Sequence, residues 1–304
     1  MSKRQLFIII AILVVLDIAA GFWYLAGHIN ADGNGAVLFD SSDEAVEAAD
    51  TVAGNSKPDH FETMAAHAYY VSRQPVEEED ASTYLSCIKR FKGRIPVSVN
   101  GNKALGELLL ALDRKAFDST STSMRACVDK FVGTPVFTAG FGDIDYKKIK
   151  AEPDVVMGYG YVEGVKVYPV FGSKCFLVMA IDKTGFTGKE DVEKMAFVTY
   201  DRIHQRVLNA YDMLDMSQEG ALLRVLNDAA ESQHGIEGGI PKLPQELCPR
   251  RNGFYFIFPA GTIDSRVAQV YVPYKKVWGQ LGASFRHMVK SNTGFKTYDP
   301  VSYR

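Results

Sequence analysis

The stretch GFYFIFPAGTIDSRVAQVYVPY, Gly253–Tyr274, decides the fold class that we expect for this chain. Two apolar runs flank a polar break that contains Gly261. The unbroken apolar run at 254–258 is typical of an interior strand, and Gly261 permits the chain to reverse. The stretch therefore predicts the inner hairpin of a sheet, followed by a helix with Pro273 in its first turn. We assign it a scaffolding role.

Further strands are expected upstream of this hairpin. CFLVMAI (175–181) is apolar on both faces, as a central strand should be. MAFVTYD (195–201) and QRVLNAY (205–211) flank a short turn at 202–204. VVMGYGYVEGVKVYPVF (155–171) predicts a hairpin that turns at Glu163-Gly164, and YLSCIKRFKGRIPVSV (84–99) predicts one or two strands.

Apolar residues at helical spacing predict several amphipathic helices. The first follows Asn102 as its cap, and the second runs from Met124 to Phe131. A third follows a capping box at Asp215 and ends near Gly235, and a closing helix covers 277–288. A short helix over 61–71 is also expected. Strands and helices are grouped rather than alternating, which predicts an α+β fold with a largely antiparallel sheet packed by amphipathic helices.

The N-terminal segment predicts a membrane anchor. Residues 6–25 form about twenty nearly uninterrupted apolar positions, enough to cross ~30 Å of hydrocarbon. Lys3 and Arg4 precede the segment and no base follows until Lys57, which predicts a cytoplasmic N-terminus and an extracytoplasmic body. A cleaved signal peptide is the alternative. Asp17 lies at mid-span, either facing a partner helix or as a protonated acid in a lone helix.

Charge divides the chain into parts. We expect a cytoplasmic tip and anchor at 1–29, an acidic flexible tether at 30–80, an α+β domain at 81–290 and a tail at 291–304. The tether carries twelve acids and two bases, whereas the whole chain has a formal charge of -2. Since residues 1–29 carry about +1 and the tether about -10, residues 81–304 carry about +7.

The four cysteines leave two alternatives open. An extracytoplasmic location permits disulfides, in any of three pairings, while the apolar surroundings of Cys127 and Cys175 favour buried thiols. The four are Cys87, Cys127, Cys175 and Cys248. Their long, irregular spacing argues against a zinc site.

No catalytic, cofactor-binding or metal-ligating residues stand out. GYGYVEG (158–164) precedes a β-like run instead of the helix that a phosphate loop requires, and the six histidines form no metal-binding motif. An alternative hydrolytic site could only be assembled from distant residues around the 182–204 loop. Its candidates are Asp182, Glu190, Asp201 and His204.

Short runs of cations beside aromatic residues are the more useful feature. They are CIKRFKGR (87–94), PRRNG (249–253) and YKKVW (274–278). In an extracytoplasmic body such runs favour anionic envelope polymers or lipid headgroups, and they do not favour nucleic acid. Because the runs are short and dispersed, a solvated surface without a partner is the alternative.

The order of segments from Val165 to Val289 resembles a known domain. The TYD…VLNAYDML segment and the FYFIF…VYVPY hairpin are its most specific parts. The domain is the extracytoplasmic domain of unknown function of RsiV-type, lysozyme-sensing anti-sigma factors, which also precedes the catalytic module of some membrane-anchored peptidoglycan deacetylases. Where such proteins carry a Gly-Gly-Ala-His-like loop, this chain has TGFTGKEDVE (184–193), without histidine.

Two expectations qualify what the resemblance implies. Only Met1–Gln5 are expected inside the cell, too few to hold a sigma factor, and no deacetylase module follows the domain. A lysozyme partner is implied by the resemblance alone. Because lysozymes are typically cationic, a basic body disfavours it.

These observations predict a single-pass binding or sensing module of the cell envelope, without evident catalytic machinery or cofactor. Its partners are the inner membrane, through the N-terminal helix, and an anionic cell-wall polymer or an envelope protein. The alternatives are an envelope hydrolase, or a structural subunit of an envelope complex that uses Asp17 to pair with another membrane helix.

Overall fold

The computed structural model describes residues 58–75, 82–134, 161–187, 191–236 and 239–298. Contacts divide the chain into two units, Met1–Ala49 and Asp50–Arg304, and every described residue belongs to the second. Within these described ranges, no helix combines the length and apolar character needed to cross a membrane. The predicted anchor at 6–25, with Asp17, lies outside them.

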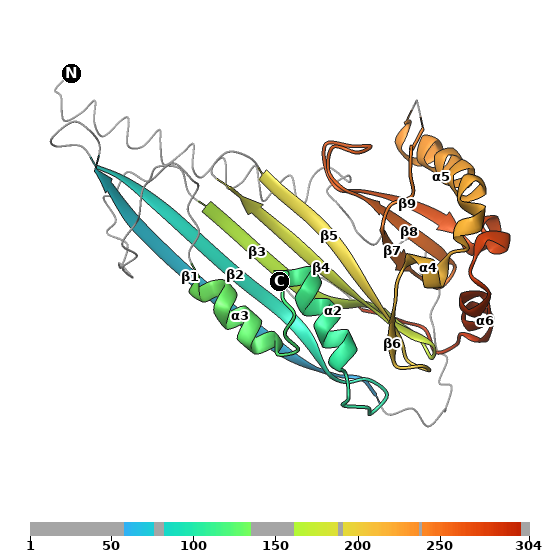
Figure 1. The fold of residues 1–304 in the computed structure, drawn as a ribbon, viewed down its shortest axis with the longest axis horizontal. Helices are drawn as coiled ribbons and strands as arrows, with labels where there is room; N and C mark the ends of the chain where they lie inside the picture. The colour runs from blue at the N-terminus through green and yellow to red at the C-terminus, as the bar shows by residue number, and fades with distance from the viewer. Residues whose placement is uncertain (1–57, 76–81, 135–160, 188–190, 237–238, 299–304) are drawn as a thin grey trace, which may run out of the picture. The chain divides into compact units, whose positions relative to one another are not determined.

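The main sheet contains seven of the described strands (Figure 1). In sheet order they are β1 (His60–Pro75), β2 (Ser82–Ser98), β3 (Tyr161–Gly172), β4 (Phe176–Phe186), β5 (Asp191–Asp201) and β6 (Arg206–Leu208), with β10 (Lys296–Thr297) pairing with β3. Every described pair is antiparallel except β2–β3, which is parallel. The predicted α+β fold with a largely antiparallel sheet is confirmed.

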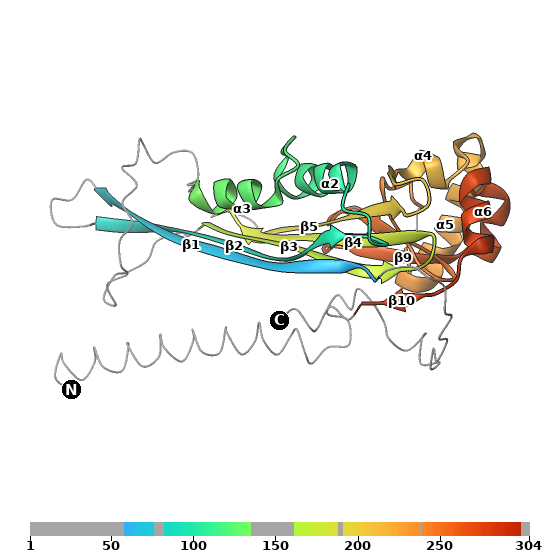
Figure 2. The ribbon, with the colours of Figure 1, turned by 90° about the horizontal axis from the view of Figure 1, so that it is seen from below.

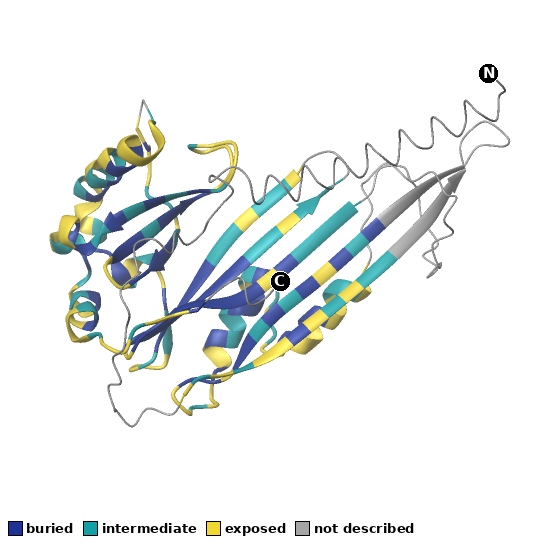
Figure 3. Cartoon of the chain, turned by 180° about the vertical axis from the view of Figure 1, so that it is seen from behind, coloured by how far each residue is buried: buried dark blue, intermediate teal, exposed yellow. Residues whose placement is uncertain are grey.

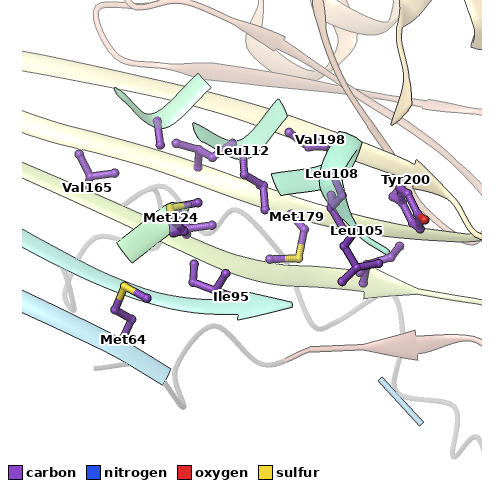
Figure 4. Packing of buried hydrophobic residues seen from close by; sticks show 14 of the residues in the cluster. Met64, Ile95, Leu105, Leu108, Leu112, Met124, Val165, Met179, Val198 and Tyr200 are labelled. Atoms are coloured by element: carbon purple, nitrogen blue, oxygen red, sulfur yellow. The ribbon is translucent and has the colours of Figure 1, made fainter. Parts of the chain in front are cut away.

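Two helices cover one face of this sheet (Figure 2). They are α2 (Gly106–Phe117) and α3 (Met124–Gly133), the two helices predicted from apolar spacing. Leu108 and Leu112 of α2 are fully buried and face sheet residues such as Met179 and Val198 (Figure 4). Burying each such side chain stabilises the fold by about 1.5–3 kcal/mol, so this layer holds much of the core.

A smaller sheet contains the opening hairpin. It comprises β7 (Glu246–Pro249), β8 (Gly253–Phe258) and β9 (Ala268–Pro273), all antiparallel. The predicted hairpin is confirmed. A Cβ added to Gly253 would collide with the backbone of Val272 and Pro273, so β8 and β9 approach closely there.

Helix α5 (Glu219–His234) closes the free edge of β9. The Gln233 side chain donates a hydrogen bond to the Tyr271 carbonyl (2.8 Å) and accepts one from the Tyr271 N–H (2.9 Å). His234 Nε2 lies 2.7 Å from the Gln269 carbonyl oxygen. These side chains occupy backbone groups that an exposed edge would offer to other chains.

Aromatic rings join the two sheets through helix α6 (Ala283–Ser291). The Phe285 ring lies 6.0 Å from Phe176 of β4 and 5.4 Å from Phe254 of β8, centroid to centroid. Phe254 also contacts Tyr274 edge-on at 5.0 Å. The short elements between these parts are α4 (Ala210–Met213) and the 3₁₀ turns η2 (Met216–Gln218), η3 (Tyr274–Lys276) and η4 (Trp278–Gln280).

Two predictions about β-structure were wrong. Residues 61–71 form part of strand β1 and not a helix, because they pair along their length with β2. No hairpin turns at Glu163-Gly164, since β3 runs straight through both residues. Gly164 lies between β2 and β4 in the sheet, where a Cβ would come within 3.2 Å of Thr184 Oγ1.

Two helix boundaries also differ from the predictions. Asn102 does not cap α2; its side chain accepts from Ala104 N (2.9 Å), while Leu105 occupies the N-cap position. The closing helix begins at Ala283 and not near Val277, and Pro273 ends β9. An isolated bridge between Leu214 and Leu281 holds the chain extended just before α6.

All four cysteines lie in the described part of the chain and are buried, and no disulfide joins them. The thiol alternative is therefore the one that the structure supports. Burial raises the pKa of the Cys248 thiol to about 11, so this group stays protonated at neutral pH.

Candidate functional site

The face of the main sheet turned away from α2 and α3 is visible in Figure 3. Strand β2 alternates strictly here: Phe91 and Ile95 point to the helices and are buried, so Arg90, Lys92 and Arg94 point the other way. Arg90 is exposed, and the other two are half-buried. The run CIKRFKGR thus delivers three cations to one face.

Strand register extends this set across the sheet. Lys92 pairs with Lys166 of β3, which is exposed and lies between the buried Val165 and Val167. Arg90 pairs on its other side with the exposed His67 of β1. We call Arg90, Lys92, Arg94 and Lys166 the basic face.

The geometry of the basic face is fixed by the strands. Side chains two residues apart on one strand are separated by roughly 7 Å, so Arg90, Lys92 and Arg94 form a straight row. Directly opposed side chains have Cβ atoms about 5 Å apart, which places Lys166 beside that row. The Arg94 guanidinium also lies 5.1 Å from the Phe61 ring centroid.

Lys89 belongs to the opposite, helix-covered face although it is part of the same run. Its side chain is buried, with the ammonium 3.6 Å from Glu163 and 4.7 Å from the Phe131 ring centroid. Lys89 is therefore compensated inside the fold and contributes nothing to the basic face.

Acidic residues begin one strand further along this face. Asp182 of β4 pairs with Lys166, and Glu193 of β5 lies next along the same face. Burial raises the pKa of Asp182, while the charge of Lys166 opposes that rise. The cations of the basic face are thus concentrated on β2 and β3.

The other two cationic runs are placed differently. Arg250 is buried and donates to the Val170 carbonyl at 2.9 Å, which is a structural role. Arg251 lies 4.8 Å from the Phe295 ring, and Lys275 and Lys276 are exposed in η3. Neither run contributes to the row of cations on β2.

The hydrolytic candidates are only partly brought together. His204 Nδ1 lies 2.6 Å from Asp201 Oδ2, with Asp201 buried and the imidazole largely exposed. Phe176 pairs with Asp201, so Asp182 lies six residues along β4 from that pair, roughly 20 Å away. Glu190 lies outside the described residues.

The Asp201–His204 pair also has a structural explanation. Asp201 Oδ1 accepts from the backbone N–H groups of Ile203 (2.9 Å) and His204 (3.1 Å), which caps the β5–β6 turn. Over the described ranges, no group of three or more acidic, histidine or cysteine side chains could hold a metal ion.

Lys166 is the member of the basic face that sequence reasoning missed. Its only local sign is a lone charge between two buried valines of a strand. The pairing of Lys166 with Lys92 joins residues far apart in the chain, and a single sequence does not reveal that register.

The fold is similar to those of two solved structures. One is a member of the DUF3298 family from Bacteroides fragilis NCTC 9343, with a TM-score of 0.53 and 13% identity, covering 78% of this chain and all of that chain. The other is a DUF3298 family protein from Pseudomonas aeruginosa PAO1, with a TM-score of 0.47 and 14% identity, covering 76% of this chain and 98% of that one. No protein-family model and no curated protein matches the chain.

The similarity to the Bacteroides structure shows that this chain and that protein share a fold. DUF3298 is a domain family of unknown function, so the similarity names no ligand and no reaction.

Proposed function

We propose that this chain is a membrane-anchored, extracytoplasmic binding module whose basic face holds an anionic cell-wall polymer. The single observation that carries the proposal is the basic face itself. It presents four cations on the sheet face opposite α2 and α3, and among the described residues Asp182, the acid paired with Lys166, belongs to the neighbouring strand β4.

A straight row of cations suits an extended ligand. Arg90, Lys92 and Arg94 repeat at roughly 7 Å, and a polymer with regularly spaced anionic groups could contact them in succession. Since strand pairing already holds the backbone of the row in place, binding requires ordering only of the Arg and Lys side chains. Such contacts are largely electrostatic and weaken as salt shortens the ~8 Å screening length.

The compartment in the proposal comes from the sequence. The apolar segment at 6–25, with Lys3 and Arg4 before it, supports an inner-membrane anchor and an extracytoplasmic body. The resemblance to the outer domain of RsiV-type proteins supports the same location. The basic face disfavours a cationic partner such as lysozyme.

Cosedimentation with bacterial cell-wall sacculi that retain their anionic polymers tests the proposal. The full chain, in mild detergent, is compared with a variant carrying Arg90→Gln, Lys92→Gln and Arg94→Gln. We expect the variant to bind at least about tenfold more weakly, and wild-type binding to fall steeply between 50 and 300 mM salt, since salt screens contacts of this kind.

A matched triple variant controls for the change in net charge. Arg266→Gln, Lys275→Gln and Lys276→Gln remove three exposed cations away from the basic face, and this variant should bind like the wild type. Equal binding by the basic-face variant would refute the proposal. Binding to anionic lipid vesicles without binding to sacculi would also refute it, because the ligand of the basic face would then be a membrane surface and not a polymer.

A further inference from the structure

A cavity of about 260 Å³ lies at the edge of the main sheet, on the side that α2 covers. The C-terminal half of α2, strands β4 and β5, and the small sheet all contribute to its wall. Its polar lining consists of Lys115, Lys183, Lys194 and Glu246. The cavity is separate from the basic face, because Lys183 and Ile181 share the helix-covered face of β4 with buried Met179.

Two of these lysines are held together by strand register. Lys183 of β4 pairs directly with Lys194 of β5, so two ammonium groups project from neighbouring strands on one face. Like charges placed opposite each other destabilise a sheet. Burial lowers the pKa of Lys183, and the charge of Lys194 lowers it further, although Asp118 and Glu163 oppose the shift.

Glu246 does not compensate this pair. Its Oε1 and Oε2 lie 2.5 and 2.7 Å from Lys115 Nζ, and Oε2 also accepts from the Phe197 N–H at 2.9 Å. In the described part of the chain, neither Lys183 nor Lys194 forms an ion pair within 4.0 Å. The cavity therefore carries an excess of two positive charges.

The rest of the lining is apolar. It consists of Ile181, Met195, Ala196, Ile257, Pro259 and Val267. A cavity of about 150 Å³ accommodates benzene, and drug-sized ligands occupy about 300–1,000 Å³. A volume of about 260 Å³ thus suits a body somewhat larger than one aromatic ring.

We infer that this cavity binds a small amphipathic carboxylate, whose anionic head contacts Lys183 and Lys194 and whose apolar body lies against Ile181 and Ile257. The head neutralises the opposed lysines, and the body displaces water from an apolar wall. Lys115 positions Glu246 and leaves the other two ammonium groups for the ligand.

The test uses 3-phenylpropanoate with the full chain in mild detergent. We expect a saturable rise in the melting midpoint and saturation-transfer NMR signals from the phenyl protons. The uncharged 3-phenylpropan-1-ol, which controls for partitioning into the micelle, should give neither effect at equal concentration. Inorganic phosphate alone should not reproduce the rise, because it lacks the apolar body.

Variants locate the site. Lys183→Met should weaken binding of the carboxylate at least about tenfold, and it should fold well because it removes a desolvated charge. Ala196→Phe, which fills the cavity, should abolish binding independently. Lys130→Met, at an exposed position of α3, is the control and should bind as the wild type does.

Three results would overturn the inference: no saturable response of the wild type, an equal response to the alcohol or to phosphate, or unchanged binding by Lys183→Met. The triple variant of the basic face should keep its response to 3-phenylpropanoate. Loss of polymer binding with retention of carboxylate binding therefore separates this site from the proposed function.

Discussion

At the scale of single residues, Asp113 of α2 is the most unusual side chain of the core. It is fully buried, and neither carboxylate oxygen forms a hydrogen bond of normal geometry with a described residue. Burial raises the pKa of Asp113 to about 6, and the nearby Cys127 thiol offsets only part of that rise. The fold therefore favours the neutral acid.

The pH dependence of stability follows from this shift. The folded-state pKa lies above the ordinary value of 3.8, so the folded state binds the proton more tightly than the unfolded state. The contribution of Asp113 to the free energy of unfolding is fully present below pH ~4, and it is lost as pH rises through about 6. Asp113→Asn should then raise the free energy of unfolding at pH 7.5 by on the order of 2–3 kcal/mol relative to its effect at pH 4.

Urea denaturation of both proteins at the two pH values measures this difference. Asp129→Asn, at an exposed position of α3, should show no such pH-dependent gain. If Asp113→Asn changed stability equally at pH 4 and pH 7.5, the buried carboxylate would not be the titrating group.

Residue-level chemistry was only partly predictable from the sequence. The run at 87–94 indicated a cationic surface, but only strand alternation separates the buried Lys89 from the outward Arg90, Lys92 and Arg94. The opposed pair of Lys183 and Lys194 had no local sign, since register creates it.

At the scale of elements, an ion pair ties four separate segments together. Arg202, in the β5–β6 turn, donates to both carboxylate oxygens of Asp59, which precedes β1, and their side chains are only 6% and 8% exposed. Arg202 also donates to Asn100 Oδ1 (2.8 Å), and the Tyr298 hydroxyl donates to Asp59 Oδ2 (3.1 Å). The pair therefore fixes the ends of strands that lie far apart in sequence.

Removing one partner should be costly. Arg202→Met leaves Asp59 buried and uncompensated, which should lower the free energy of unfolding by about 3–5 kcal/mol. Burial alone would raise the pKa of Asp59, but the Arg202 hydrogen bonds and charge hold it below 3.8. The ion pair thus stabilises the fold above pH ~4 and is lost as pH falls, so the variant should also lose this acid sensitivity.

The matched control is a more exposed ion pair of the same type. Arg206 lies 2.8 Å from Asp212, with side chains 43% and 20% exposed, so Arg206→Met should cost less than about 1 kcal/mol. Equal losses for Arg202→Met and Arg206→Met in chemical denaturation would contradict the assigned role of the buried pair.

Elements with a strong local period were predicted well, and those that depend on distant partners were not. The helices α2 and α3, strand β4 and the β8–β9 hairpin follow from apolar spacing. Residues 61–71 contain alanines that favour a helix, yet pairing with β2 makes them a strand. Gly164 suggested a turn, whereas close packing in mid-sheet explains it.

At the scale of the whole molecule, the net charge of -2 describes no part of the chain well. The acidic segment at 30–80 offsets a basic remainder, and the structure places four of the cations together on one face. Composition predicted a basic body, but the concentration of cations on β2 and β3 depends on the sheet order, which composition does not determine.

The proposed location rests on the charges around the apolar segment at 6–25. Lys3 and Arg4 lie before this segment, and the positive-inside bias keeps such residues in the cytoplasm. A fusion of alkaline phosphatase after Arg304 should therefore be active. A fusion of green fluorescent protein at the same position should not fluoresce, because the general secretion route exports it unfolded.

An inverted charge pattern provides the matched control. Replacing Lys3 and Arg4 by Glu, with Ala31, Gly33 and Gly35 replaced by Lys, reverses the bias without touching the apolar segment. Phosphatase activity per molecule should then fall several-fold, because positive residues near the end of a membrane helix resist translocation. If the wild-type fluorescent-protein fusion fluoresced and the wild-type phosphatase fusion were inactive, the basic face would lie in the cytoplasm. A cell-wall polymer could not reach it there.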